Sequence, residues 1–328
     1  MATAIGVDTV TSIARRYIMP TITDQVYPAN VILWRIMRAN KKMVQGGTQI
    51  DVPSMFRRFS AGGPYRGFDP LDTTPSDTIR NAQFDWKQHY VPWSLSGLTL
   101  IQTDSPDAIA NFLQLQAQQA FMEMGENLAT SLFNDGTNVK DIDSLRSAVG
   151  NASVGNATYG GITRSANPWW NSFVDASTST LTLASIHGLI MSASRGGQHP
   201  TILLGRQEQY NRLWTLGTTT TGYTIQQSRL PGGHDEMLLS AGFTNILVDN
   251  IPFVVDPHVD NGPNANNSRI YALNENVINL VVSPRADFYL EDFQKPVNQD
   301  AMVAMILWAG NLVNMAPNLC GVMTAVAA

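Results

Sequence analysis

The chain has 328 residues, which is long enough for one large folded domain or two smaller ones, each with its own hydrophobic core. The single cysteine, Cys320, excludes an internal disulfide and a cysteine-based zinc site, and it indicates synthesis in a reducing compartment. Only 14% of the residues are charged, and arginine outnumbers lysine 16 to 5. This bias is typical of chains whose surfaces are covered by partners, because interfaces are depleted in lysine.

The N-terminal third of the chain predicts an arm followed by a long hairpin. Residues 8–40 favour two short helices that are interrupted by Pro20 and Pro28. From residue 46 to residue 97 the pattern is extended, with a turn-rich tip at 60–75 between an outgoing and a returning strand. Because a two-stranded hairpin is only marginally stable alone in water, we expect this one to lie on another surface, such as a neighbouring chain.

A long amphipathic helix is predicted next, over residues 105–135. Ser105 is a suitable N-cap, Pro106 suits the first helical position, and Asn134 begins the Asn-Asp-Gly stop. Apolar residues recur between these signals at helical spacing, so one face should be buried. At about 1.5 Å per residue, the 29 residues from Pro106 to Asn134 would span roughly 43 Å.

The chain after this helix predicts a mixed α+β fold. From residue 181 a helix, a strand and a second helix come first, and NILVDNIPFVVD then predicts a hairpin that turns at Asp249 and Asn250. RIYALNENVINLVV predicts a further strand, turn and strand. Residues 301–328 are uncharged, but their longest apolar run is about half of a membrane span. We therefore expect buried strands there and no membrane anchor.

Recognisable catalytic motifs are absent, because the chain lacks a Walker glycine loop, GxGxxG, HExxH, CxxC and GxSxG. The best remaining constellation is Asp256, His258 and Asp260, which in extended chain could present carboxylate and imidazole ligands to a divalent metal. A polar loop after a strand explains the same residues without a metal, and Pro257 favours that explanation. We expect no enzyme activity, no metal and no cofactor, and a metal-dependent hydrolase is a remote alternative.

Seven stretches of sequence, together with the order of the predicted elements, resemble one known family. They are VQGGTQIDVPSMF, FDWKQ, LFNDGT, YGGITRSANPWW, GFTNILVDNIPFVVD, YALNENVINL and NQDAMVAMILWAGNL. The chain resembles the major capsid proteins of tailed double-stranded DNA phages, whose fold is the α+β Hong Kong 97 type. The resemblance implies an N-terminal arm at 1–45, an extended loop at 46–100, a peripheral domain at 101–180 with a spine helix at 105–135, an axial domain at 181–270, and a return to the peripheral domain at 271–328.

The resemblance implies a structural role. The chain would assemble with copies of itself into hexamers and pentamers of an icosahedral shell around packaged double-stranded DNA, in a virion whose proteins are made in the bacterial cytoplasm. It implies a portal and a separate scaffold protein as partners, with a decoration protein as an optional one. Since no lysine lies between Lys42 and Lys87, we expect no covalent crosslink from the extended loop. An encapsulin-like bacterial compartment shell with enclosed cargo is the alternative.

Two sets of charged residues are candidates for contacts in such a shell. Residues 1–87 carry 11 basic and 7 acidic side chains, whereas 88–328 carry 10 and 19. By resemblance the basic arm would face DNA and bind phosphates without sequence preference, through Arg15, Arg16, Arg35, Arg38, Lys41 and Lys42. The hairpin arginines Arg57, Arg58 and Arg66 are expected to meet carboxylates of an adjacent subunit, with Glu291 and Asp292 as candidates. Solvation of these arginines is the alternative.

Overall fold

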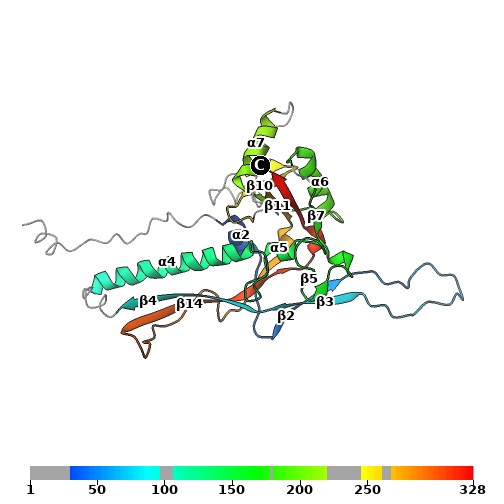
Figure 1. The fold of residues 1–328 in the computed structure, drawn as a ribbon. Coiled ribbons are helices and arrows are strands. Elements are labelled where there is room, and N and C mark those ends of the chain that lie inside the picture. The colour runs from blue at the N-terminus through cyan, green and yellow to red at the C-terminus, as the bar shows by residue number, and fades with distance from the viewer. Residues whose placement is uncertain (1–29, 97–105, 178–179, 220–244, 261–266, 328) are drawn as a thin grey trace, which may run out of the picture. The chain divides into compact units, whose positions relative to one another are not determined.

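The computed structural model describes residues 30–96, 106–177, 180–219, 245–260 and 267–327 (Figure 1). The first predicted helix, within 8–28, and the Ser105 cap lie outside these residues. The helices are α2 (Val31–Ala39), α4 (Pro106–Leu132), α5 (Leu145–Ala148), α6 (Leu183–Ala193) and α7 (Gln207–Thr219), with 3-10 turns η1 (Pro168–Trp170), η2 (Glu275–Val277) and η3 (Pro317–Leu319). The chain divides into two compact units: unit 1 holds the described residues of 90–125 and 290–306, and unit 2 holds the others.

A six-stranded sheet forms the centre of unit 2. Its order is β7 (Phe173–Asp175), β15 (Gly321–Ala327), β11 (Asn267–Leu273), β8 (Ile202–Gly205), β10 (Ile251–Val255) and β9 (Asn245–Val248). Helix α6 packs its apolar residues, among them Ile186 and Ile190, into the same buried cluster as Leu203, Phe253 and Met323. Strands β10 and β15 are buried along most of their length, because both faces of a covered central strand are buried.

The predicted turn between β9 and β10 is confirmed. Asp249 and Asn250 have φ angles of 50° and 64°, the left-handed values that a two-residue type I′ hairpin requires and that Asp and Asn tolerate. The predicted unit RIYALNENVINLVV is confirmed as two strands joined by η2. Its strands belong to different sheets, however, because β11 pairs with β15 and β8, while β12 (Ile278–Val282) pairs with β1 (Lys41–Met43) and β14 (Ala301–Asn314).

The uncharged C-terminal region forms long buried strands, as expected. Strand β14 is the centre of a five-stranded sheet with β1, β12, β13 (Tyr289–Leu290) and β4 (Lys87–Ser96). Asn311 interrupts the apolar sequence and is fully buried, yet its amide donates to Asp85 O and to Asp143 Oδ2, both at 2.9 Å. No helix in the described part of the chain is long and apolar enough to cross a membrane.

The extended hairpin is present, and one part of its prediction is corrected. Strands β2 (Gln49–Met55) and β3 (Ile79–Asp85) form an antiparallel two-stranded ribbon, with Gln49 opposite Asp85 and Met55 opposite Ile79. The returning segment was expected as one strand, but it breaks at Trp86, after which β4 pairs with β14 instead of β2. Side chains alternate between the two faces of a strand whichever strand is its partner. The alternation in the sequence therefore does not show that the partner changes from β2 to β14 at Trp86.

Helix α4 confirms the long predicted helix, with 27 residues from Pro106 to Leu132. Its C-terminal half is buried on one side through Met124, Leu128 and Leu132, at the spacing of four that places side chains on one helix face. Strands β5 (Thr158–Tyr159) and β6 (Ile162–Thr163) form a small separate hairpin in unit 2. The described chain therefore contains one long helix, two larger sheets and two separate two-stranded sheets.

Candidate interaction surfaces

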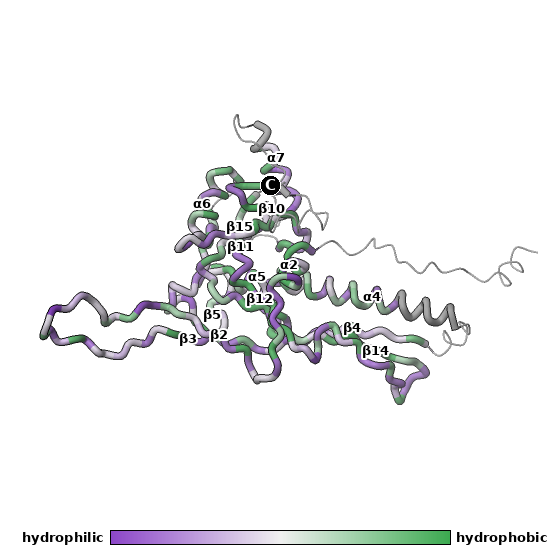
Figure 2. The backbone as a smooth tube through the Cα atoms, turned by 180° about the vertical axis from the view of Figure 1, so that it is seen from behind, coloured by the Kyte–Doolittle hydropathy of each residue, from purple (hydrophilic) through white to green (hydrophobic). Residues whose placement is uncertain are grey.

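The tip of the extended hairpin, residues 57–77, exposes large apolar side chains. Phe59 is 74% exposed, Phe68 is fully exposed, and Tyr65 and Leu71 are each more than half exposed. Figure 2 shows hydrophobic stretches along this ribbon between hydrophilic ones. A two-stranded ribbon has no core in which to bury such residues, and a concentration of them on a surface is characteristic of an interaction site. The tip is therefore a candidate contact surface.

The base of the same hairpin is held firmly within unit 2. Phe84 packs edge-on against Tyr159 with ring centroids 5.1 Å apart, and the Gln83 N–H donates to Gly160 O at 2.9 Å. Gly160 has a φ of +57°, and a Cβ there would lie 2.8 Å from Phe84 Cζ. On the other strand, Phe56 stacks on Trp169 at 5.5 Å. The tip thus extends from an anchored base.

The support beneath this base depends on a buried arginine. Arg164 is fully buried and donates to the carbonyls of Ser147, Ala148 and Asn156 at 2.8 to 3.1 Å. Its guanidinium lies 5.3 Å from the centre of the Tyr159 ring. Burial lowers the pKa of Arg164 to about 10, because desolvation disfavours the charged form. Sequence reasoning missed this residue, since nothing in the sequence distinguishes it from a surface arginine.

The arginines predicted to contact a neighbour lie on the exposed tip. Arg57 donates to Asp77 O at 2.5 Å and lies over the Phe56 ring, while Arg58 and Arg66 are exposed. Of the proposed partners in unit 1, Asp292 is exposed and Glu291 is partly buried, accepting a hydrogen bond from Gln294 at 3.3 Å. Their pairing between copies stays a prediction.

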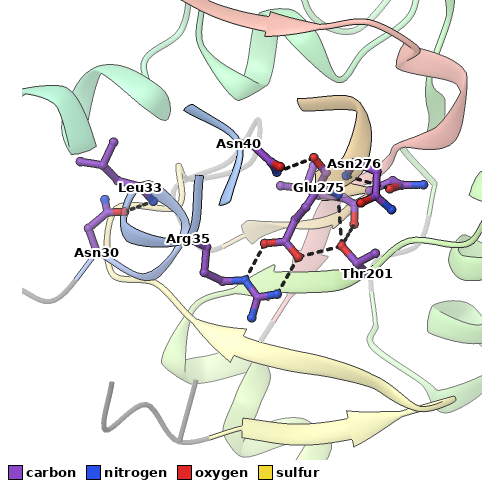
Figure 3. Close-up of polar contacts among 9 residues, drawn as sticks. Asn30, Leu33, Arg35, Asn40, Thr201, Glu275 and Asn276 are labelled. Atoms are coloured by element: carbon purple, nitrogen blue, oxygen red, sulfur yellow. Dashed lines mark hydrogen bonds and ion pairs between the residues drawn. The ribbon is translucent and has the colours of Figure 1, made fainter. Parts of the chain in front are cut away.

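The basic residues assigned to a DNA-facing surface differ in how the structure places them. Arg35 on α2 is buried and forms a bidentate ion pair with Glu275 at 2.5 and 2.6 Å, and Thr201 Oγ1 donates to the same carboxylate at 2.9 Å (Figure 3). The expectation for Arg35 is therefore corrected, because its guanidinium is used inside the fold. Lys41 is paired with Asp287 at 2.5 Å. Arg38 and Lys42 are exposed, whereas Arg15 and Arg16 lie outside the described residues.

The residues considered as metal ligands do not converge on one point. Asp260 has partners different from those of Asp256 and His258. It forms an ion pair with Arg269 at 2.6 Å and accepts a hydrogen bond from Tyr271 Oη at 2.6 Å. His258 contacts Asp256 Oδ1 through Nδ1 at 3.1 Å and Glu126 Oε1 on α4 through Nε2 at 2.8 Å. Both ring nitrogens are thus engaged. Among the described residues, no group of three His, Cys, Asp or Glu side chains is arranged to hold a metal.

The contacts of His258 shift its titration. Burial alone would lower its pKa, but the hydrogen bonds and negative charges of Asp256 and Glu126 outweigh burial and raise it. The imidazole connects α4 to the loop after β10, within unit 2. Glu126 lies 132 positions away along the chain, so no local sequence signal could have identified it as the partner. The polar-loop interpretation of these residues describes the geometry better than the metal-site interpretation.

Comparison with solved structures identifies the fold over nearly the whole chain. A chain of the cyanophage A-1(L) capsid asymmetric unit is 17% identical with a TM-score of 0.68, covering 96% of this chain and 98% of that chain. A chain of the holo-SrpI encapsulin complex from Synechococcus elongatus PCC 7942 is 12% identical with a TM-score of 0.61, covering 99% and 96%. A capsid chain of Myoviridae phage XM1 is 12% identical with a TM-score of 0.54, covering 99% of each chain.

No protein-family model matches the chain. No curated protein matches it by sequence at a significant level. The structural likeness confirms the predicted fold class: the chain has the α+β fold of tailed-phage capsid proteins, the Hong Kong 97 type.

Proposed function

We propose that this chain is the major capsid protein of a tailed double-stranded DNA phage and assembles with copies of itself into hexamers and pentamers of an icosahedral shell. The observation that carries the proposal is a likeness to phage capsid chains that covers 96% or more of both chains. A likeness of this extent includes the hairpin as well as the sheets. The role is structural, and no enzymatic step is assigned to it.

The exposed hairpin tip supports this proposal physically. A subunit that circulated alone would keep Phe59, Tyr65, Phe68 and Leu71 in water, whereas a shell would bury them against neighbours. Only 14% of the residues are charged, which also suits a chain whose surface is largely covered. In a closed symmetric shell the number of subunits is limited, because head-to-tail contacts between subunits that do not close into a ring or shell would produce open fibres.

The parts of the subunit follow from the same proposal. Residues 1–45 would form the arm, 46–100 the extended loop, 101–180 and 271–328 the peripheral domain, and 181–270 the axial domain around each capsomer centre. The six-stranded sheet crosses this last boundary, because it includes β7 and β15. The virion would be the location of the protein, with a portal, a scaffold and, optionally, a decoration protein as partners. The exposed Arg38 and Lys42 would contribute weak, salt-sensitive contacts to packaged DNA.

Electron microscopy of the protein expressed alone and fractionated by size tests self-assembly. We expect closed icosahedral particles or rings of five and six subunits. A matched pair of variants connects the particles to the tip: Phe68→Ser should reduce assembly, whereas Val139→Ser, which changes another exposed apolar side chain in unit 2, should not. A monodisperse monomer at every protein concentration would contradict the proposal.

An encapsulin-like compartment shell is the second candidate, and the likeness to the holo-SrpI encapsulin complex favours it specifically. The two candidates differ in what the particle encloses. Particles from the native source that contain nuclease-protected double-stranded DNA would support the capsid. Particles that contain a stoichiometric protein cargo and no such DNA would support the compartment.

A further inference from the structure

His258 lies between two carboxylates that come from different elements of unit 2. Its Nε2 is 2.8 Å from Glu126 Oε1 on helix α4, and its Nδ1 is 3.1 Å from Asp256 Oδ1 in the loop after β10. The His258 side chain is 8% exposed, that of Asp256 is fully buried, and that of Glu126 is 25% exposed. Glu126 is also the first residue of α4 that belongs to unit 2. The imidazole therefore attaches this part of the helix to the loop.

The number of protons on the His258 ring decides how many of these two contacts are hydrogen bonds. A carboxylate can only accept, so each ring nitrogen needs a proton in order to bond to its carboxylate. The charged imidazole has two N–H groups and satisfies both carboxylates, whereas the neutral imidazole has one and satisfies only one of them. The other carboxylate then faces the lone pair of a bare ring nitrogen. Loss of one proton must therefore break one of the two contacts.

Burial decides which carboxylate keeps the remaining proton. Asp256 is fully buried, and its Oδ2 has no hydrogen-bond partner among the described residues. Removing a donor from this carboxylate costs more than removing one from Glu126, which can turn to water instead. The amide nitrogen of Asn30 favours a bare Nδ1, but it lies 3.4 Å away, longer than an ordinary hydrogen bond. The proton therefore stays on Nδ1, and the contact that is lost is the one with Glu126.

The charged groups that face His258 from the elements around it are Asp256 and Glu126, while the α2 cap contributes the neutral side chain of Asn30 (Figure 3). Burial lowers the pKa of His258, but the hydrogen bonds and charges of the two carboxylates outweigh burial and raise the pKa above its ordinary value. The second proton is therefore present in weakly acidic solution and is lost as the pH rises through the raised value.

The next charged groups along the chain have partners of their own. Asp260 forms an ion pair with Arg269 at 2.6 Å, and Arg206 donates through Nε to the Val259 carbonyl at 2.8 Å. The protonation of His258 is therefore governed by the two carboxylates that it contacts directly.

We propose that the contact between His258 and Glu126 is a pH-dependent switch for helix α4, closed while the imidazole carries two protons and open when Nε2 has lost its proton. In the open state Glu126 turns to water, and α4 loses this attachment to the loop after β10, while Asp256 stays bound to Nδ1. The switch is a property of the single subunit and does not depend on the proposed shell function.

Nitrogen NMR of the full chain, labelled with ¹⁵N-histidine and kept as size-fractionated subunits, reports the protons on each ring nitrogen. The His258 signals are assigned by their loss in His258→Gln. We expect two ring protons at about pH 5.5 and, at the upper end of the titration, one proton on Nδ1. Absence of a titration between about pH 5 and pH 10, or a remaining proton on Nε2, would overturn the proposal.

Hydrogen exchange measures whether α4 is released. Exchange of the amides of residues 126–132 is followed by mass spectrometry at one pH below and one pH above the measured titration, and each rate is corrected for the pH dependence of unprotected amides. In the unchanged protein the protection of these amides should fall about tenfold above the titration, the effect of one lost hydrogen bond to a charged group. Equal protection on the two sides would show that the contact does not hold the helix.

Three variants connect this change to the switch. Glu126→Gln keeps a partner for either state of the ring, because a carboxamide can accept from a protonated Nε2 or donate to a bare one. Its protection should change less than about twofold across the titration, and His258→Gln, which has no titrating ring, should behave in the same way. His187→Gln is the matched control, since it removes an exposed imidazole that contacts Asp249 at 2.6 Å in the same unit, and it should keep the tenfold change seen in the unchanged protein, to within about twofold. A tenfold change that persists in either Glu126→Gln or His258→Gln would assign the pH dependence to other groups and overturn the proposal.

Discussion

Replacement of Glu275 by glutamine should strongly destabilise the fold, because it leaves the buried Arg35 without its full counter-charge. The two side chains are 1% and 6% exposed, and the guanidinium contacts both carboxylate oxygens at 2.5 and 2.6 Å. Removing one member of such a buried pair costs about 3–5 kcal/mol, since the remaining charge stays desolvated. Replacing both, as in Arg35→Met with Glu275→Leu, should recover most of that loss, because no charge is then left unpaired.

Urea unfolding of size-fractionated subunits, followed by fluorescence, measures these free energies. An exposed ion pair provides the matched control: Lys295 and Asp300 lie 3.1 Å apart with side chains 67% and 75% exposed, so Asp300→Asn should cost less than about 1 kcal/mol. The reasoning is refuted if Glu275→Gln loses no more stability than Asp300→Asn. It is also refuted if the double replacement is no more stable than Glu275→Gln alone.

Three further predictions concern the imidazole cluster, the hairpin base and the hairpin tip. The pKa of His258 is raised in the fold, so its stabilising contribution should be complete below its unfolded pKa of about 6.5 and be lost as the pH rises through the folded value. The stability difference between the unchanged protein and His258→Gln, measured by urea unfolding, should therefore be larger at pH 5.5 than at pH 8.5; an equal difference would contradict this assignment. Gly160→Ala should destabilise subunits by about 1–3 kcal/mol in the same assay, because it combines a positive φ with a Cβ 2.8 Å from Phe84 Cζ. Gly161→Ala, at a φ of +71° with nothing within 4 Å, should cost less, and the reverse order would show that the close approach is unimportant. Phe68→Ser should leave subunit stability within about 0.5 kcal/mol, because this side chain is fully exposed, and a larger loss in urea unfolding would mean that the tip packs on its own subunit.

Local signals in the sequence were sufficient for most of the elements. Helix α4 ends at Leu132, just before the predicted Asn-Asp-Gly stop, because these residues favour turns and a left-handed backbone. The β9–β10 turn was predicted at the right two residues for the same local reason, since Asp249 and Asn250 tolerate positive φ. Signals of this kind depend on a few neighbouring residues, which the linear sequence displays directly.

Pairing between distant segments could not be predicted in the same way. The exchange of strand partners at Trp86 and the separation of β11 from β12 into different sheets depend on which neighbours each strand meets. Alternation of polar and apolar residues reports a half-buried strand but does not identify its partner. Arg35 was expected at a DNA-facing surface for a similar reason: its charge was visible in the sequence, whereas its partner Glu275 lies 240 positions away.

The sequence by itself determined the class of fold, the long helix, the extended hairpin and the absence of recognisable catalytic motifs, because composition, periodicity and turn residues act over short distances. Only the tertiary structure decided which charges are available to a partner. It buried Arg35 and Arg164 and directed His258 to Asp256 and Glu126. Burial and pairing arise from contacts between segments that are remote in the chain, and these contacts exist only once the chain has folded.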